Sequence, residues 1–137
     1  MTGVIATIVG ELEALTDSMP KIRLKRVYEP PAKGDGLRIL VERLWPRGLT
    51  KEKAALDHWL KEVAPSPELR RWYDHKPERW PGFQERYRTE LAEMPEALER
   101  LRALCAGGPV TFVYAARDEA RNSAVVLRAL LSDDTES

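Results

Sequence analysis

The sequence predicts a small α/β fold in which helices pack on a mostly parallel sheet to give a three-layer sandwich. Residues 22–27 alternate apolar and basic side chains and residues 37–44 form an apolar run, both typical of strands, and a third strand pattern at residues 109–115 follows only after a long stretch of helical pattern. Strands separated by helices tend to pair in parallel, because the crossover between them needs a dozen or more residues. A chain of 137 residues with 43% hydrophobic side chains also suits a single domain with its own core.

Residues 1–20 differ from the rest of the chain. Their apolar side chains recur at roughly helical spacing and end at Pro20, which predicts a short amphipathic extension. Met19 would itself serve as a start, so residues 1–18 are either an optional or misassigned extension or a genuine helix that packs on the domain or on a second subunit. The domain proper is expected at residues 21–131, followed by an acidic tail at residues 132–137.

The first two strands are separated by a loop. Residues 22–27 alternate apolar and basic side chains, as a half-exposed strand does. Prolines and glycines break residues 30–36 into a loop, and the apolar run of residues 37–44 then predicts a buried strand. Trp45 and Pro46 are expected to stop that strand, because proline lacks a backbone N–H and restricts the residue before it.

Two helix starts follow the second strand. Thr50 is a good cap for a helix whose apolar face is expected to be Leu56, Trp59, Leu60 and Val63. Ser66 repeats the signal, with Pro67 at the first helical position, and predicts a short helix through Leu69 and Trp72.

Three further helices and one strand complete the prediction. Pro81 opens a helix whose apolar face is Trp80, Phe83, Tyr87 and Leu91. Pro95 opens the next, which the two glycines at residues 107–108 close. A core strand at residues 109–115 and a last helix from about Asp118 to Leu131 follow.

Composition removes several classes of function. The 22 basic and 22 acidic side chains cancel, so no global field draws the protein to nucleic acid or to an acidic membrane. The single cysteine, Cys105, excludes an intramolecular disulfide and a cysteine-based metal cage, and it is expected to be a buried hydrophobe. No apolar stretch approaches the ~20 residues of a transmembrane helix. We expect a cytoplasmic protein with no membrane partner, metal site or cofactor.

The strongest site candidate is the end of the last strand and the turn after it, residues 114–118. In open α/β sheets, ligands bind at the carboxyl ends of strands, beside helix N-termini that favour anions. Arg117 would clamp a phosphate or carboxylate there, Asp118 would cap the helix, and Asn122 lies one turn on. The alternative is that Asp118 is only a cap and Arg117 only a solvated surface charge.

A second turn, residues 44–48, also follows a strand. Arg43 and Arg47 flank a rigid corner made by Trp45 and Pro46, which would present guanidinium groups to the same cleft. A structural corner with Trp45 buried is the other interpretation. If the two strands are neighbours, both turns line one edge of the sheet.

Two histidines are candidates for acid/base chemistry, since histidine titrates near neutral pH. His75 lies on a loop between helices, where a packing or hydrogen-bonding role is the alternative. His58, beside Asp57 and expected inside a helix, is interpreted as a surface or core residue. Tyr114 joins His75 as the second candidate near a reacting group.

Many of these segments resemble the YeaO-like branch of the DUF488 family. The resemblance rests on residues 26–28, 40–49, 59–61, 64–66, 69–73, 77–80, 108–111, 114–118, 122 and 124–127, and on His75, Phe83, Tyr87 and Leu91. It implies an α/β sandwich and a site location in bacterial cytoplasmic proteins, but no reaction, since the family has no settled activity. It also implies a histidine where Arg121 stands; Arg121 would bind an anion but not shuttle protons near neutral pH.

Three functions stay open at this stage. The first is binding or turnover of a small anionic ligand, phosphorylated or nucleotide-like, in a site formed by Arg43, Trp45, Arg47, Arg117, Asp118, Arg121 and Asn122. The second is a nucleic-acid-associated module that uses residues 21–48, where eight basic side chains face three acidic ones. The third is a regulatory or interaction domain, monomeric or homodimeric, with the N-terminal segment as the dimer contact.

Overall fold

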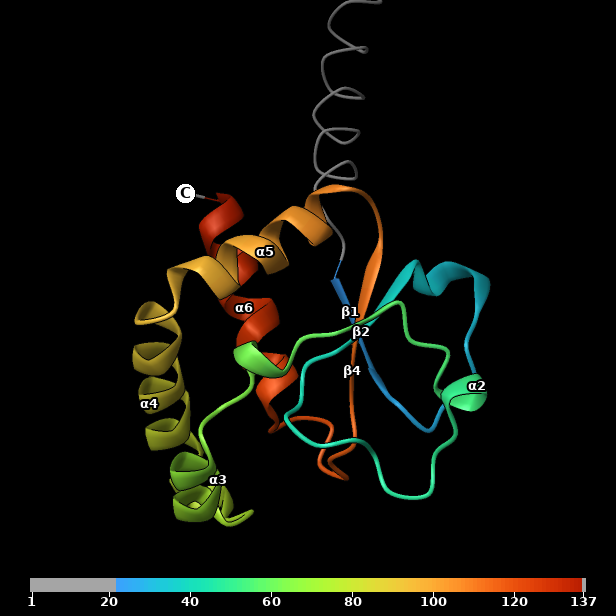
Figure 1. The fold of residues 1–137 in the computed structure, drawn as a ribbon. Helices are drawn as coiled ribbons and strands as arrows, with labels where there is room; N and C mark the ends of the chain where they lie inside the picture. Colours follow the sequence, from blue (N-terminus) through green and yellow to red (C-terminus); the bar gives the residue numbers. More distant parts are fainter. Residues whose placement is uncertain (1–21, 137) are drawn as a thin grey trace, which may run out of the picture.

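The computed structural model describes residues 22–136 as an α/β fold around a four-stranded sheet (Figure 1). All strand pairs are parallel, as the sequence predicted. In spatial order the strands are β1 (Ile22–Arg26), β4 (Val110–Tyr114), β2 (Leu37–Leu40) and β3 (His58–Trp59). The predicted extension at residues 1–20 lies outside the described residues.

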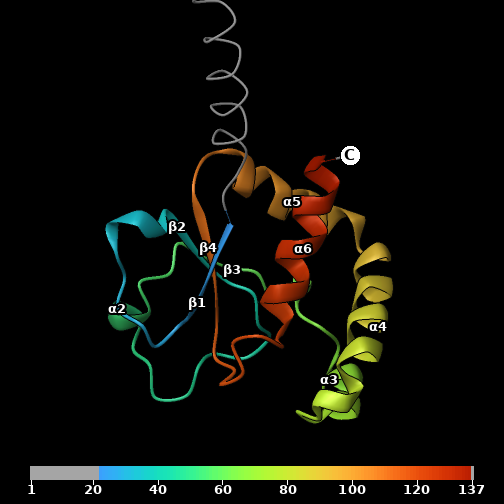
Figure 2. The same cartoon turned by 180° about the vertical axis from the view of Figure 1, so that it is seen from behind.

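The larger helices gather on one side of the sheet, with α2 on the other (Figures 1 and 2). They are α3 (Pro67–Tyr73), α4 (Trp80–Ala92), α5 (Pro95–Ala106) and α6 (Ser123–Glu136). Within residues 22–136, the far side carries the one-turn helix α2 (Lys51–Ala54) and irregular segments. Three short 3-10 turns, η1 (Lys33–Asp35), η2 (Lys61–Val63) and η3 (Pro77–Arg79), join these elements.

Strand β4 explains why the protein has two cores of unequal size. Its five residues are all buried, because it lies between β1 and β2 and is covered on both faces. Val110, Phe112 and Tyr114 enter the large core under α4, α5 and α6, whereas Val113 enters a small cluster on the face of α2. This alternation is the period of two that a strand imposes on its side chains.

The predicted helix through residues 56–63 is wrong. Thr50 does cap a helix, since its Oγ1 accepts a hydrogen bond from the Lys53 N–H at 3.2 Å, but Ala55 adopts a left-handed conformation and ends α2 after one turn. The following segment is β3 and η2 instead. Trp59 packs in the small cluster while Leu60 packs in the large core, so their side chains serve opposite faces of the sheet and not one face of a helix.

Two other boundaries differ from the prediction. The second strand stops at Leu40, four residues before its predicted end at Leu44. His58, which was expected inside a helix, lies instead in the edge strand β3. The predicted helix starts are confirmed: Ser66 caps α3, and Pro81 and Pro95 lie in the first turns of α4 and α5.

Gly36, which leads from η1 into β2, is expected to tolerate no side chain. Its φ is 63°, and a Cβ there would lie 2.0 Å from the carbonyl oxygen of Pro109. Substitution Gly36→Ala is expected to lower the free energy of unfolding by about 2–3 kcal/mol, measured by urea denaturation. Gly107→Ala is the matched control, since its φ is −81° and the nearest atom is 3.7 Å away. Equal losses in both variants would contradict this reading of Gly36.

Candidate functional site

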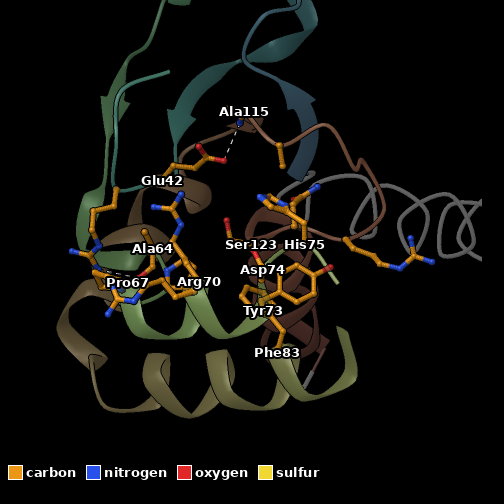
Figure 3. A pocket seen from close by; sticks show the side chains of 16 residues that line it. Glu42, Ala64, Pro67, Arg70, Tyr73, Asp74, His75, Phe83, Ala115 and Ser123 are labelled. Carbon is orange, nitrogen blue, oxygen red and sulfur yellow. Dashed lines mark hydrogen bonds between the residues drawn. The ribbon is translucent and has the colours of Figure 1, made fainter. Parts of the chain in front are cut away.

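A pocket of about 560 Å³ opens where the segments after β2 and β4 meet α3 and the start of α6 (Figure 3). Its volume is in the range of small-molecule sites. The lining comes from three separated parts of the chain and from Phe83 of α4. These parts contribute Glu42 and Arg43; Ala64, Pro65, Pro67, Arg70, Arg71, Tyr73, Asp74 and His75; and Ala115, Ala116, Arg121, Asn122 and Ser123.

Glu42 ties the two strand ends together. Its Oε1 accepts a hydrogen bond from the Ala115 N–H at 2.9 Å, the contact drawn in Figure 3. Burial raises the pKa of Glu42, although the Ala115 N–H and the positive charge of Arg70 act in the opposite direction. Glu42 is a pocket residue that was not predicted from the sequence. The available signal was a carboxylate inside an apolar run, since a buried charge needs partners.

Four arginines line the same pocket, against the two carboxylates of Glu42 and Asp74. Arg43 donates from Nη2 to the Ala64 carbonyl at 3.5 Å, while its Nε is buried and has no hydrogen-bond partner within residues 22–136. Arg70 and Arg71 come from α3. Two of the four arginines also have a carboxylate partner outside the lining, since Arg71 pairs with Glu68 at 4.0 Å and Arg121 with Asp118 at 3.1 Å. Each guanidinium carries five N–H donors, so the lining still offers donors to an anion with several acceptor oxygens.

The turn before α6 positions the fourth arginine. Asp118 accepts hydrogen bonds from the N–H groups of Ala120 and Arg121, and its Oδ2 lies 3.1 Å from Arg121 Nη1. Burial would raise the pKa of Asp118, but these hydrogen bonds lower it on balance. The carboxylate therefore holds the turn and Arg121 together.

Helix α6 starts at Ser123, later than the predicted start at Asp118. Asn122 is the residue that caps it, since Oδ1 accepts from the Val125 N–H at 3.1 Å and Nδ2 donates to the Asp118 carbonyl at 2.9 Å. Because Asp118 closes a turn with Ala120 and Arg121, α6 begins only after that turn. Ser123, the first residue of α6, lines the pocket, and the positive end of the helix dipole favours an anion there.

The structure brings four of the nine predicted site residues to this pocket: Arg43, His75, Arg121 and Asn122. Asp118 does not line the pocket, but it forms an ion pair with Arg121, which does. Tyr114 is buried in the large core, where burial raises its pKa.

Three predicted residues lie away from the pocket. Trp45 packs edge-on against Trp59 with ring centroids 5.4 Å apart, and its Nε1 donates to the Leu49 carbonyl. The Arg47 carbonyl accepts from the Tyr28 hydroxyl, and the side chains of Arg47 and Arg117 are exposed. The corner formed by Trp45 thus helps to cover the opposite face of the sheet.

Asp74 and His75 form a strained rim on the pocket. Both adopt left-handed backbone conformations, with φ of 49° and 54°. Asp74 adopts this conformation as the C-cap of α3, where its N–H donates to the Arg70 carbonyl at 3.0 Å. His75 continues in the same region of backbone conformation, which costs a residue with a side chain roughly 1–2 kcal/mol. Figure 3 shows both residues beside Tyr73, on the side of the pocket away from Glu42.

Other kinds of site find little support in the described part of the chain. Residues 22–136 contain no group of three or more His, Cys, Asp or Glu side chains placed to hold a metal ion. Cys105 is buried in α5, and burial raises the pKa of its thiol to about 11, which suits a packing role. Among these residues, no helix has the length and apolar character needed to cross a membrane.

Comparison with known proteins identifies relatives without a stated activity. The model of a family described as the inactive DUF488-N3 subclade matches residues 21–137. An uncharacterized protein of Mycobacterium tuberculosis is 46% identical over 112 residues, which cover 82% of this chain and 94% of the relative. The uncharacterized protein YeaO of Escherichia coli is 43% identical over 106 residues, covering 77% and 92%. No solved structure matches the chain.

Proposed function

Because this chain belongs to the DUF488 family, within the subclade described as inactive DUF488-N3, we propose that its pocket binds a small phosphorylated or nucleotide-like anion without turning it over. The observation that carries the proposal is the convergence of Arg43, Arg70, Arg71 and Arg121 on one pocket of about 560 Å³. Guanidinium groups bind phosphate and carboxylate oxygens through two parallel hydrogen bonds, which favours a planar or tetrahedral oxyanion.

The backbone adds to this preference. Arg121 and Ser123 bring the start of α6 to the pocket, and the first N–H groups of a helix have no partner within the helix. Aromatic and proline side chains, among them Tyr73, Phe83 and Pro67, supply apolar walls for the rest of a ligand. A few convergent polar groups on an apolar wall are typical of small-molecule sites.

Binding without turnover agrees with the chemistry of the lining. Arg121 stands where the family resemblance implies a histidine, and a guanidinium does not exchange protons near neutral pH. Tyr114 is buried outside the lining. The family description as inactive supports the same conclusion.

Titration calorimetry with inorganic phosphate, ribose 5-phosphate and nucleoside monophosphates tests the proposal. The Kd of the tightest-binding compound is expected to rise about tenfold in Arg121→Gln, because one charge-assisted contact is lost. Arg117→Gln is the matched control: Arg117 is exposed in the same turn but does not line the pocket, and its Kd should change less than twofold.

Two outcomes would count against the proposal. Wild-type protein that binds none of these compounds would remove it. A loss in Arg117→Gln as large as that in Arg121→Gln would place the contact on the surface of the turn and not in the pocket. Ligand recovered unchanged after long incubation is the result expected for binding without turnover.

A further inference from the structure

Glu42 is an acidic side chain in a pocket that we propose binds an anion. Glu42 lies on the same pocket as the four arginines, and its carboxylate is half-buried. It has partners for part of its acceptor capacity, since Oε1 takes the Ala115 N–H at 2.9 Å and the Ala116 N–H also lowers the pKa of this carboxyl against the effect of burial. A carboxylate offers about four acceptor positions, so capacity is left for a ligand.

The positive charge of Arg70 favours the ionised form of the Glu42 carboxylate. Arg70 is the charged side chain whose attraction opposes the effect of burial on Glu42, and both residues line the pocket. Glu42 and Ala115 lie together at one side of the pocket, whereas Tyr73, Asp74 and His75 lie at the other (Figure 3). Burial raises the pKa of Tyr73 and the positive charge of Arg121 lowers it, so Arg121 lies near Tyr73. The site therefore has one end at the Glu42 carboxylate and another end formed by Asp74, His75 and Arg121.

The pocket is larger than a phosphate ion alone would fill. A volume of about 560 Å³ is much larger than a bare phosphate ion needs, and it suits a ligand with a phosphate and a further organic part. A second anionic group at Glu42 would be repelled, because like charges at short range disfavour each other. An uncharged O–H or N–H donor would instead gain a charge-assisted hydrogen bond there.

We propose that the pocket selects phosphorylated compounds whose organic part carries O–H or N–H donors, which Glu42 accepts while Arg121 and the start of α6 hold the phosphate. This inference rests on the proposed function and adds the ligand class. Sugar hydroxyls and the N–H edge of a nucleobase share the required chemistry. Pro67, Tyr73 and Phe83 form the wall along which either organic part would lie.

Glu42→Gln tests the role of the carboxylate. Glutamine has the same shape and keeps a carbonyl oxygen for the Ala115 N–H, so the joint between the strand ends survives. It loses the negative charge and places an NH₂ group where a donor would approach. The expected effects have opposite signs: the Kd for ribose 5-phosphate or a nucleoside monophosphate rises tenfold or more, while the Kd for inorganic phosphate stays within twofold or falls.

The compounds separate the two sources of the donor. Tenfold weakening for ribose 5-phosphate as well as for every nucleoside monophosphate assigns Glu42 to sugar hydroxyls. Weakening confined to the nucleoside monophosphates, with the Kd of ribose 5-phosphate unchanged, assigns Glu42 to the base. Glu52→Gln, which removes an exposed acid on α2 at the opposite face, is the control for a change in net charge and should leave every Kd unchanged.

Three results would overturn the inference. In one, inorganic phosphate binds wild-type protein as tightly as any organic phosphate. In another, Glu42→Gln tightens or leaves unchanged the binding of organic phosphates and phosphate alike, which makes Glu42 a structural joint only. Both leave the proposed anion site standing. Failure of wild-type protein to bind any compound removes the proposed function and this inference together.

Discussion

Arg38→Met is expected to lower the free energy of unfolding by about 3 kcal/mol, because it breaks a buried ion pair and leaves the Asp35 carboxylate with Lys25 as its remaining cation. Arg38 and Asp35 have side-chain exposures of 3% and 5%, and Nη1 lies 2.8 Å from Asp35 Oδ2. Arg38 also donates from Nε to the Ala54 carbonyl at 3.1 Å, so it joins η1 to α2 across the small cluster. Urea denaturation measures the loss.

Arg100→Met is the matched control for this variant. Arg100 pairs with Glu62 on the surface, where both side chains are largely exposed, and an exposed pair contributes at most about 1 kcal/mol. A loss for Arg38→Met no larger than that for Arg100→Met would contradict the structural role of the buried pair.

The pH dependence of the same pair has a defined sign. Burial alone would raise the pKa of Asp35, but hydrogen bonds from the Ala32 N–H, Arg38 and Lys25 lower it on balance. Asp35 therefore contributes stability above its unfolded pKa of about 3.9, and this contribution is lost as the pH falls through the lower folded-state value. Arg38→Met should reduce the difference in unfolding free energy between pH 7 and pH 3.

The double variant Arg70→Gln/Arg121→Gln is expected to weaken binding of the tightest phosphorylated compound by about a hundredfold. Arg121→Gln removes a charge-assisted contact with the phosphate, and Arg70→Gln removes the positive charge that favours the ionised Glu42 carboxylate at the other end of the pocket. The free energy of unfolding should change by less than about 1 kcal/mol, because both side chains are exposed. Titration calorimetry and urea denaturation measure the two effects separately.

A second double variant, Arg86→Gln/Arg117→Gln, controls for net charge. Arg86 lies over the Trp72 ring on another side of α3, and neither arginine lines the pocket. Binding by this variant should stay within about twofold of wild type. A similar loss in both double variants would mean that the net charge of the protein, and not the pocket, attracts the compound.

The contrast between these variants follows from the direction of the strands. Gly36 and the Asp35–Arg38 pair lie at the amino ends of the sheet, around the start of β2, where they determine stability. The pocket lies beyond the carboxyl ends of β2 and β4. Substitutions at one end should therefore affect folding, and those at the other end should affect binding, which is common in parallel α/β proteins.

Local signals explain which elements the sequence predicted. Ser66, Pro81 and Pro95 set helix starts through contacts within a few residues, so α3, α4 and α5 could be placed from sequence. Strand β3 could not, because its two residues are held by pairing with β2, a contact that depends on the tertiary structure. The apolar spacing of residues 56–63 fits a helix equally well until the two faces of the sheet are known.

The candidate site shows the same division. Arg43 and Arg121 follow strand ends, and parallel neighbours bring such residues to one edge, so their convergence was predictable. Arg70 and Arg71 look like surface charges of a short helix until α3 is packed against the rest of the fold. The sequence favours Arg117, which closely follows the last strand, but a residue near β4 in sequence need not face the pocket.

A crystal structure of the protein with its tightest-binding phosphorylated compound tests the central claim most directly. The expected result is a phosphate within hydrogen-bond distance of Arg121 and the first N–H groups of α6, with the organic part extending toward Glu42 between Tyr73 and Ala115. The compound bound at the exposed side chain of Arg47 or Arg117, with the pocket beside Glu42 unoccupied, would contradict the claim.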